Sequence, residues 1–197
     1  MTTDTRNMYY LMFKELFKVL AQVGQSPITF QHIHGYRLVT IGVDMCNKQA
    51  GGFGDYLAEI APDRTWDEHL QHMLVFCQVH VRRNFMEKYQ KHPVFHYIKL
   101  LWTDVDNLSA LKEHIQSICV TFPEMKSWYA NKETNWILAG LSAKASKVPY
   151  EWRKIARKDT NASESSHAQD NFFTGTKNAL LHSILKYKKT RSKQSIY

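Results

Sequence analysis

RLVTIGVDM, Arg37 to Met45, is the stretch on which the interpretation of this fold depends. A short run of β-branched and apolar residues that ends in a carboxylate is typical of a buried strand. The following QAGGFGDYL, residues 49–57, contains three glycines, so we expect a tight turn there before a short helix begins. A lone strand cannot satisfy its own backbone hydrogen bonds. The strand therefore needs partners, either from another chain or from a larger fold of which this chain is a part.

Helical patterns lie on both sides of the predicted strand. Residues 8–23 repeat apolar side chains at helical spacing before Gly24, and the face predicted to be buried comprises Leu11, Phe13, Leu16, Phe17, Leu20 and Val23. Thr65 and Glu68 form a capping-box pattern, which predicts one long helix over residues 66–91. Further helical stretches are predicted over residues 93–102, 107–120, 122–141 and 171–187. The fold class predicted from these patterns is α/β and predominantly helical.

The composition favours a soluble protein with an acidic partner. Lys and Arg number 26 against 18 Asp and Glu, a formal charge of +8, which favours contact with a polyanion such as nucleic acid. The alternative is a basic protein kept soluble by its surplus charge. Three cysteines without a disulfide-like pattern, and a start without a secretory signal, predict a nuclear or cytoplasmic protein that is not secreted. The longest apolar run, residues 94–102, is too short to span a membrane.

Two carboxylates are candidates for metal-dependent chemistry. Asp44 ends the predicted strand, and α/β folds commonly place reactive groups at that end. Glu164 lies near the start of the last predicted helix and borders its inward face. Together the two could hold Mg²⁺ for phosphodiester chemistry. Each also has a structural interpretation: Asp44 can cap the glycine turn, and Glu164 can stabilise the helix through its macrodipole.

Soft and borderline metal ligands gather in the predicted helix 66–91. Cys77 and His80 lie three residues apart and share one helical face, and His69 and His72 come one to two turns earlier. Four such donors suggest zinc, but one helix cannot wrap all four around a tetrahedral ion. We therefore favour the alternative in which Cys77 is a small core residue and His80 a hydrogen-bonded, buried imidazole.

Two basic clusters are suited to phosphate contact. Arg82 and Arg83, with Lys88 and Lys91, form the first. The second lies in residues 148–158, VPYEWRKIARK, beside Trp152, and comprises Arg153, Lys154, Arg157 and Lys158. Interleaved aromatic residues could stack on unpaired bases, although packing in the core is the commoner use.

Four segments and their order along the chain are informative: VDMCNKQAGGFGDYL (43–57), FCQVHVRRNF (76–85), WILAGLS (136–142) and KDTNASESSHAQDN (158–171). Together they resemble the second half of the catalytic core of Mutator-like transposases, including divergent fungal relatives, over roughly residues 36–186. The resemblance implies an RNase H-like fold whose Asp, Asp and Glu triad binds Mg²⁺ or Mn²⁺, cuts the transposon end and joins it to target DNA. Asp44 would be the second aspartate and Glu164 the glutamate. Cys77 and His80 would occupy the Cys-x-x-His positions, with a supporting role near the active site.

The chain departs from this family pattern before Asp44. An RNase H-like core has an antiparallel hairpin and a strand ahead of its second aspartate, whereas the one earlier aspartate here, Asp4, lies in a polar leader. We therefore expect a partial core over residues 1–186, with a helical insertion at about 85–158 and a basic, disordered tail over 187–197. Two of three carboxylates should hold metal poorly.

The resulting hypothesis is a truncated, transposon-derived product that binds DNA and does not cut it alone. Its expected partners are DNA, a second copy of the chain or a full-length transposase. The alternatives are a domesticated DNA-binding regulatory protein without catalysis, and a zinc-stabilised helical module.

Overall fold

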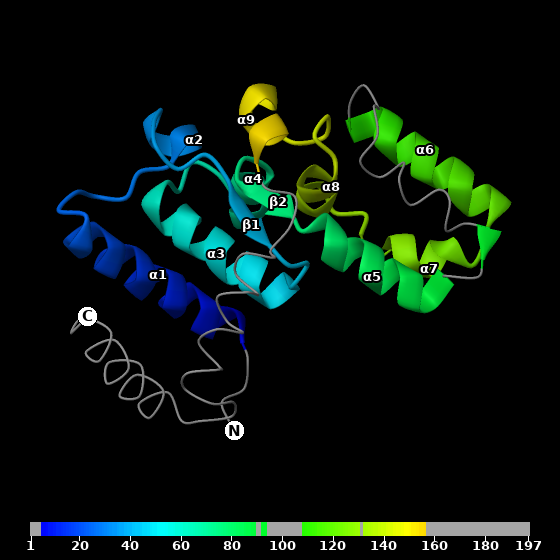
Figure 1. Ribbon diagram of the computed structural model, residues 1–197, viewed down its shortest axis with the longest axis horizontal. Coiled ribbons are helices and arrows are strands. Elements are labelled where there is room, and N and C mark those ends of the chain that lie inside the picture. Colours follow the sequence, from blue (N-terminus) through cyan, green and yellow to red (C-terminus); the bar gives the residue numbers. More distant parts are fainter. Residues whose placement is uncertain (1–4, 90–91, 94–107, 131, 157–197) are drawn as a thin grey trace, which may run out of the picture. The chain divides into compact units, whose positions relative to one another are not determined.

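The computed structural model describes residues 5–89, 92–93, 108–130 and 132–156, which all lie in the first of two units of the chain, residues 1–159. The second unit, residues 160–197, falls outside the described residues. The described elements are, in chain order (Figure 1), α1 (Arg6–Val23), α2 (Gln31–His34), β1 (Ile41–Val43), α3 (Asn47–Ile60), α4 (Trp66–Gln71), β2 (Leu74–Phe76), α5 (Gln78–Tyr89), α6 (Leu108–Thr121), α7 (Met125–Ala130), α8 (Asn135–Leu141) and α9 (Tyr150–Ile155). The prediction of a predominantly helical fold with little strand is confirmed. Within the described ranges, no helix has the length and apolar character needed to cross a membrane.

The N-terminal core forms where α1 packs side by side with α3 (Figure 1). Phe13 and Phe17 of α1 contact Phe53 of α3, with ring centroids 4.9 Å and 6.2 Å apart. Phe30, which is fully buried, meets Phe17 edge-on at 5.4 Å. Burial of each such side chain contributes about 1.5–3 kcal/mol, so this aromatic group is a main source of stability for the N-terminal half.

The glycines that follow the strand lie inside a helix, so the predicted tight turn is wrong. Gly51, Gly52 and Gly54 are buried residues of the 14-residue helix α3. A Cβ atom added at Gly52 would lie 2.6 Å from the carbonyl oxygen of Arg6 in α1, and one at Gly54 would lie 2.6 Å from the carbonyl oxygen of Trp66 in α4. The glycines therefore permit close contact between helix backbones, which sequence spacing alone does not reveal.

The apolar face of α1 is only partly buried, contrary to the prediction. Phe13 and Phe17 are each 5 % exposed, while four of the six predicted residues remain accessible: Leu11 (50 %), Leu16 (44 %), Leu20 (43 %) and Val23 (79 %). Within the predicted apolar face, Phe13 and Phe17, one turn apart, are the residues that helix α1 buries. The other four predicted residues stay accessible among the described residues.

The predicted strand has its partner within this chain. Strand β1 pairs in parallel with β2, with Ile41 opposite Leu74, Gly42 opposite Val75 and Val43 opposite Phe76. The single helix predicted over residues 66–91 is therefore wrong, because β2 divides it into α4 and α5. The capping box that begins α4 is confirmed: both the backbone nitrogen and the hydroxyl of Thr65 donate to Glu68 Oε2 at 2.9 Å.

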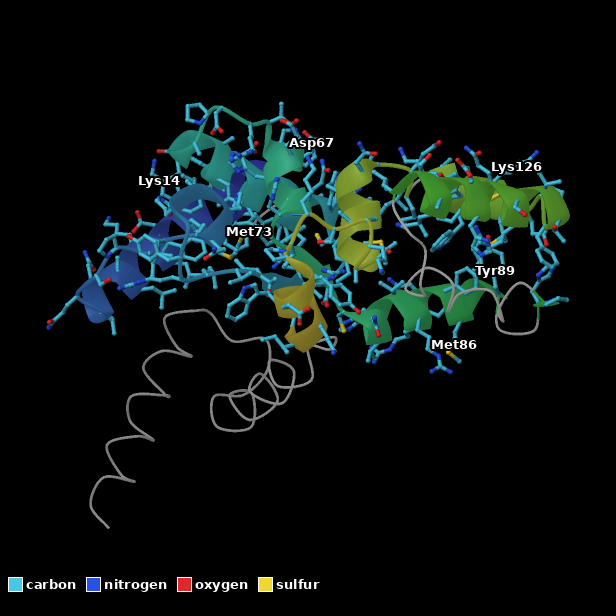
Figure 2. The ribbon with its side chains drawn as sticks, turned by 90° about the horizontal axis from the view of Figure 1, so that it is seen from above. Lys14, Asp67, Met73, Met86, Tyr89 and Lys126 are labelled. Carbon is cyan, nitrogen blue, oxygen red and sulfur yellow. The ribbon has the colours of Figure 1, made fainter. Side chains whose placement is uncertain are left out.

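A second apolar cluster lies among α5, α6, α7 and α8. Phe85 and Tyr89 of α5 pack against a group of buried residues that includes Leu111, Ile115, Ile118, Cys119, Met125, Tyr129 and Leu138. Figure 2 shows Tyr89 on the side of α5 that faces α6, while Met86 points away from it. The Tyr89 hydroxyl donates to the carbonyl of Glu124 at 3.3 Å. Helices α6 to α8 lie inside residues 85–158, where the sequence predicted a helical segment.

Helix α9 is attached to the sheet by a buried arginine. The guanidinium of Arg153 donates to the carbonyl of Leu74 in β2 at 2.7 Å and to the carbonyl of Gly140 in α8 at 2.6 Å. Arg153 is 6 % exposed, and burial lowers its pKa to about 10. A single side chain thus joins the sheet, α8 and α9.

Candidate functional site

Asp44 lies at the carboxyl end of β1, next to the carboxyl end of β2. Because the two strands are parallel and Val43 pairs with Phe76, the next residues along the two strands, Asp44 and Cys77, meet at the same edge of the sheet. The backbone fixes this register further, since the amide of Cys77 donates to the carbonyl of Val43 at 3.1 Å. Helix α5 begins at the following residue, and His80 lies in its first turn.

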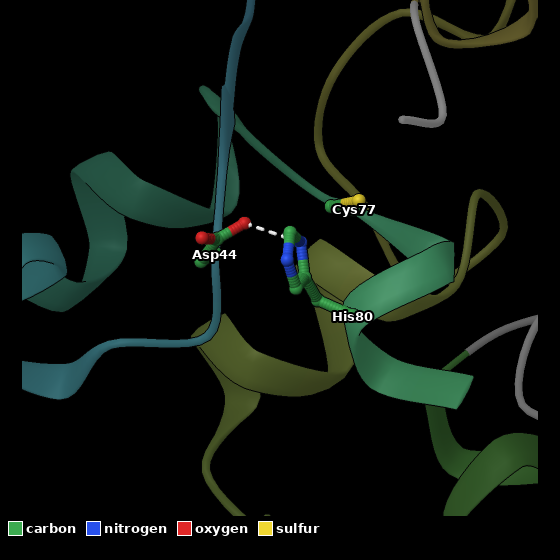
Figure 3. Close-up of side chains that lie close together, drawn as sticks. All are labelled: Asp44, Cys77 and His80. Atoms are coloured by element: carbon green, nitrogen blue, oxygen red, sulfur yellow. Dashed lines mark ion pairs between the residues drawn. The ribbon is translucent and has the colours of Figure 1, made fainter. Parts of the chain in front are cut away.

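Three side chains converge at this edge (Figure 3). His80 Nδ1 lies 2.8 Å from Asp44 Oδ1, and one potential ligand atom from each of Asp44, Cys77 and His80 lies within 4.8 Å of the other two. The Asp44 side chain is 53 % exposed and that of His80 20 %, whereas Cys77 is 2 % exposed. The Asp44–Cys77–His80 cluster is therefore open on its carboxylate side and closed on its sulfur side.

The donors around Asp44 fit Mg²⁺ poorly. Mg²⁺ selects hard oxygen ligands in octahedral geometry, while the described neighbours of the carboxylate are an imidazole and a thiol. Glu164, the second oxygen donor in the predicted site, lies outside the described residues, so its pairing with Asp44 stays a prediction. No chemical step through Mg²⁺ follows from the residues on the described side of the site.

The four-ligand zinc arrangement suggested by His69, His72, Cys77 and His80 does not form. Among the described residues, Cys77 and His80 converge with Asp44, and not with His69 or His72, as potential metal ligands. His69 and His72 contact His32 instead. Strand β2 separates His69 and His72 from Cys77 and His80. It interrupts the helix on which all four side chains were expected to share one face.

A histidine cluster of His32, His69 and His72 is a feature that the sequence did not predict. His69 Nε2 lies 2.8 Å from the carbonyl of Ala61 and must donate to it, so in the neutral state His69 Nδ1 accepts from His32 Nε2 at 2.9 Å. This leaves His32 Nδ1 buried, without a hydrogen-bond partner in the described residues. The ring of His32 stacks on that of His72, with centroids 5.3 Å apart.

The surroundings of His32 and His72 favour the neutral form of both rings. Burial, followed by the neighbouring His72 and His69, lowers the pKa of His32 to about 3. Burial, followed by Lys147 and Arg64, lowers the pKa of His72 to about 4. His32 lies in α2, far from the other two in sequence, and no local pattern connects it with them.

The predicted basic residues separate into exposed and buried groups. Arg82 and Arg83 of α5 and Lys154 of α9 are exposed, and each can reach a phosphate. Arg153 lies in the core, where its guanidinium is held by two backbone carbonyls, so it does not contribute to a basic surface. The other two predicted members of its cluster, Arg157 and Lys158, lie outside the described residues.

Comparisons of this chain with protein-family models, with curated proteins and with solved structures each found no match.

Proposed function

We propose that this chain is the DNA-binding, non-cleaving portion of a DDE-type transposase core of the Mutator-like class. The observation that carries the proposal is the 2.8 Å contact between Asp44 and His80 at the carboxyl end of β1. The sequence resemblance assigns these two residues to an aspartate that ends a strand and to a Cys-x-x-His segment beside the active site. Their contact in space supports that assignment, since Asp44 directly follows β1 and His80 lies in α5, 36 residues later in the sequence.

The arrangement of β1, α3 and β2 also supports the proposal. Strands β1 and β2 are parallel and are joined through the helices α3 and α4, which is a β–α–β type of connection, and α/β enzymes commonly place reactive groups at the carboxyl ends of such strands. An RNase H-like core would contribute such a unit at its second aspartate. The helices α6 to α9 would then belong to the insertion that precedes the closing glutamate, Glu164.

Binding to DNA would depend on the exposed cations of α5 and α9. The chain carries a formal charge of +8, and Arg82 and Arg83 are neighbouring, exposed residues that follow His80 by two and three positions in α5. Exposed arginines in the helix that carries His80 would contact a phosphate backbone without reading its sequence. With one carboxylate of the triad unassigned in these 197 residues, we expect no strand cleavage by the chain alone.

The DNA-binding part of the proposal is tested by salt dependence. Fluorescence anisotropy with a labelled duplex should give a Kd whose logarithm varies linearly with the logarithm of the salt concentration, and the double variant Arg82→Ala, Arg83→Ala should reduce the slope by about 1.8, at about 0.9 per phosphate contact. The matched control, Lys18→Ala with Lys126→Ala, removes the same charge from other exposed positions and should leave the slope unchanged. If the two double variants change the slope equally, Arg82 and Arg83 have no specific role in DNA binding and only add to the net charge that keeps the protein soluble.

The ancestry part of the proposal is tested by complementation. With Mg²⁺ or Mn²⁺ present, the chain alone should leave transposon-end DNA intact. Addition of a segment that carries the missing strands and first aspartate of a full-length Mutator-like transposase should produce nicking. Asp44→Asn should abolish it and Asp63→Asn, at an exposed aspartate elsewhere, should not. Nicking that survives Asp44→Asn would refute the role of Asp44, and nicking by the chain alone would refute its non-cleaving nature.

A further inference from the structure

We propose that the Asp44–Cys77–His80 cluster is a binding site for one divalent ion of the zinc class, with three protein ligands and one open position. The three side chains lie in the described part of the chain, and their donor atoms do not depend on transposase ancestry. A thiolate, an imidazole and a carboxylate together form a donor set that Zn²⁺, Co²⁺ and similar borderline ions prefer, and that Mg²⁺ and Ca²⁺ do not.

The backbone holds the two strand-end ligands in place before any ion binds. Asp44 and Cys77 are consecutive with the paired residues Val43 and Phe76, and the amide of Cys77 is bonded to the carbonyl of Val43. His80 follows three residues after Cys77, at the start of α5, so one turn of helix sets the distance between the sulfur and the imidazole. Two of the three ligands thus come from the register of a parallel sheet, and the third from the helix that follows it.

The ligand atoms lie close enough that shifts of about 1 Å or less in each side chain would let them coordinate one ion. Bonds of about 2.0–2.3 Å in tetrahedral geometry separate neighbouring ligand atoms by about 3.3–3.6 Å. Asp44 Oδ1 and His80 Nδ1, now at 2.8 Å, would move apart by a few tenths of an ångström, and the widest separation, at most 4.8 Å, would shorten. The Asp44 side chain, 53 % exposed, has the freedom to make this movement.

Burial also favours an ion over a nucleophilic thiol at this position. A catalytic cysteine needs an accessible, electropositive position, whereas Cys77 is 2 % exposed and its cluster contains a carboxylate. A metal ligand has no such need, because the ion can enter from the exposed side of Asp44. Three protein ligands and one position for water or substrate are typical of a reactive zinc site, whereas structural sites use four protein ligands.

The test uses Co²⁺ with the full-length chain under reducing conditions. Titration should give one equivalent of bound Co²⁺ and a thiolate-to-cobalt charge-transfer band in the near ultraviolet. Cys77→Ser should abolish the band, and the matched variant Cys119→Ser, at the other buried cysteine, should retain it. Zn²⁺ should displace Co²⁺ stoichiometrically, and a large excess of Mg²⁺ should not.

Asp44→Asn provides a second readout if Cys77→Ser fails to fold. Asp44 is exposed, so this variant should keep the circular dichroism spectrum and thermal unfolding of the parent chain, yet weaken Co²⁺ binding by more than the roughly 10- to 100-fold typical of losing an outer-shell partner. The proposal is overturned if the parent chain binds no Co²⁺ in stoichiometric amount, if the band persists in Cys77→Ser, or if Mg²⁺ displaces the ion. These outcomes do not involve Arg82 or Arg83, so failure here leaves the proposed DNA binding standing.

Discussion

Replacing Gly52 by alanine has two opposing effects on the free energy of unfolding, a gain in helix propensity and a clash with α1. In an isolated helix, glycine to alanine stabilises by about 1 kcal/mol, because alanine restricts the unfolded chain and has the higher helix propensity. In this protein the new Cβ would lie 2.6 Å from the carbonyl oxygen of Arg6 and from the amide nitrogen of Tyr10. Both atoms belong to the backbone of α1, so no side-chain rotation relieves the contact.

The clash should outweigh the gain in helix propensity. An ordinary van der Waals separation would require α1 to move away from α3 by about 0.8 Å, and overpacking of this kind costs about 1–3 kcal/mol or more. We expect a net loss of about 1–2 kcal/mol in the free energy of unfolding. For a chain of this size, such a loss lowers Tm by roughly 2–8 °C.

The neighbouring glycine supplies the control. A Cβ at Gly51 would meet the Arg6 side chain at 2.9 Å, and that side chain can rotate away. The substitution would then sacrifice the pairing of Arg6 with Asp55, which is 38–41 % exposed and worth at most about 1 kcal/mol. Gly51→Ala should therefore lie within about 0.5 kcal/mol of the parent chain, since the propensity gain offsets this loss.

Urea denaturation followed by far-ultraviolet circular dichroism measures both variants. Gly52→Ala should be less stable than Gly51→Ala, with similar m-values for the two variants. Equal stabilities, or a gain in Gly52→Ala, would refute close backbone contact as the reason for glycine in α3.

Two further predictions concern buried polar groups. Arg153→Ala removes the donor to two buried carbonyls and should lower the free energy of unfolding by about 2–4 kcal/mol. The control Lys154→Ala, at the next and exposed position, should change it by less than about 0.5 kcal/mol. Equal losses in the two variants would refute the structural role of the buried guanidinium. His32 and His72 have folded-state pKa values of about 3 and about 4, below an unfolded value near 6.5, so the unfolded chain binds more protons and stability falls as the pH drops from about 6.5 toward 4. After halving for their partial exposure, each of these two histidines should cost about 1 kcal/mol of stability between pH 7 and pH 5. The double variant His32→Gln, His72→Gln should therefore flatten the pH profile of the free energy of unfolding by about 2 kcal/mol in urea titrations, and an unchanged profile would contradict the neutral state of His32 and His72.

Local patterns were sufficient to predict elements whose periodicity is strong. Helix α1 was predicted over residues 8–23 and spans Arg6–Val23. The strand that ends at Asp44 was predicted from its β-branched residues, although β1 itself is limited to Ile41–Val43. In both cases the residues that decide the structure are neighbours in the sequence.

The features that could not be predicted depend on contacts between distant segments. Strand β2 has three residues, and the capping box and apolar spacing around it favour a continuous helix, so only its pairing with β1 reveals it as a strand. Arg153 has the sequence context of a phosphate-binding residue, and its burial follows from carbonyls in β2 and α8. The same applies to the candidate site, because Asp44 and His80 meet only once the sheet has formed.

The position of Arg153 has a consequence for synthesis of the protein on the ribosome. The carbonyl of Leu74 accepts a hydrogen bond from a residue 79 positions later, so β2 must leave the exit tunnel well before its donor has been made. During that interval a nascent chain presents an incompletely bonded strand, and such edges are sites of mispairing between chains. The Leu74 carbonyl therefore gains its Arg153 donor only after α9 has left the tunnel as well.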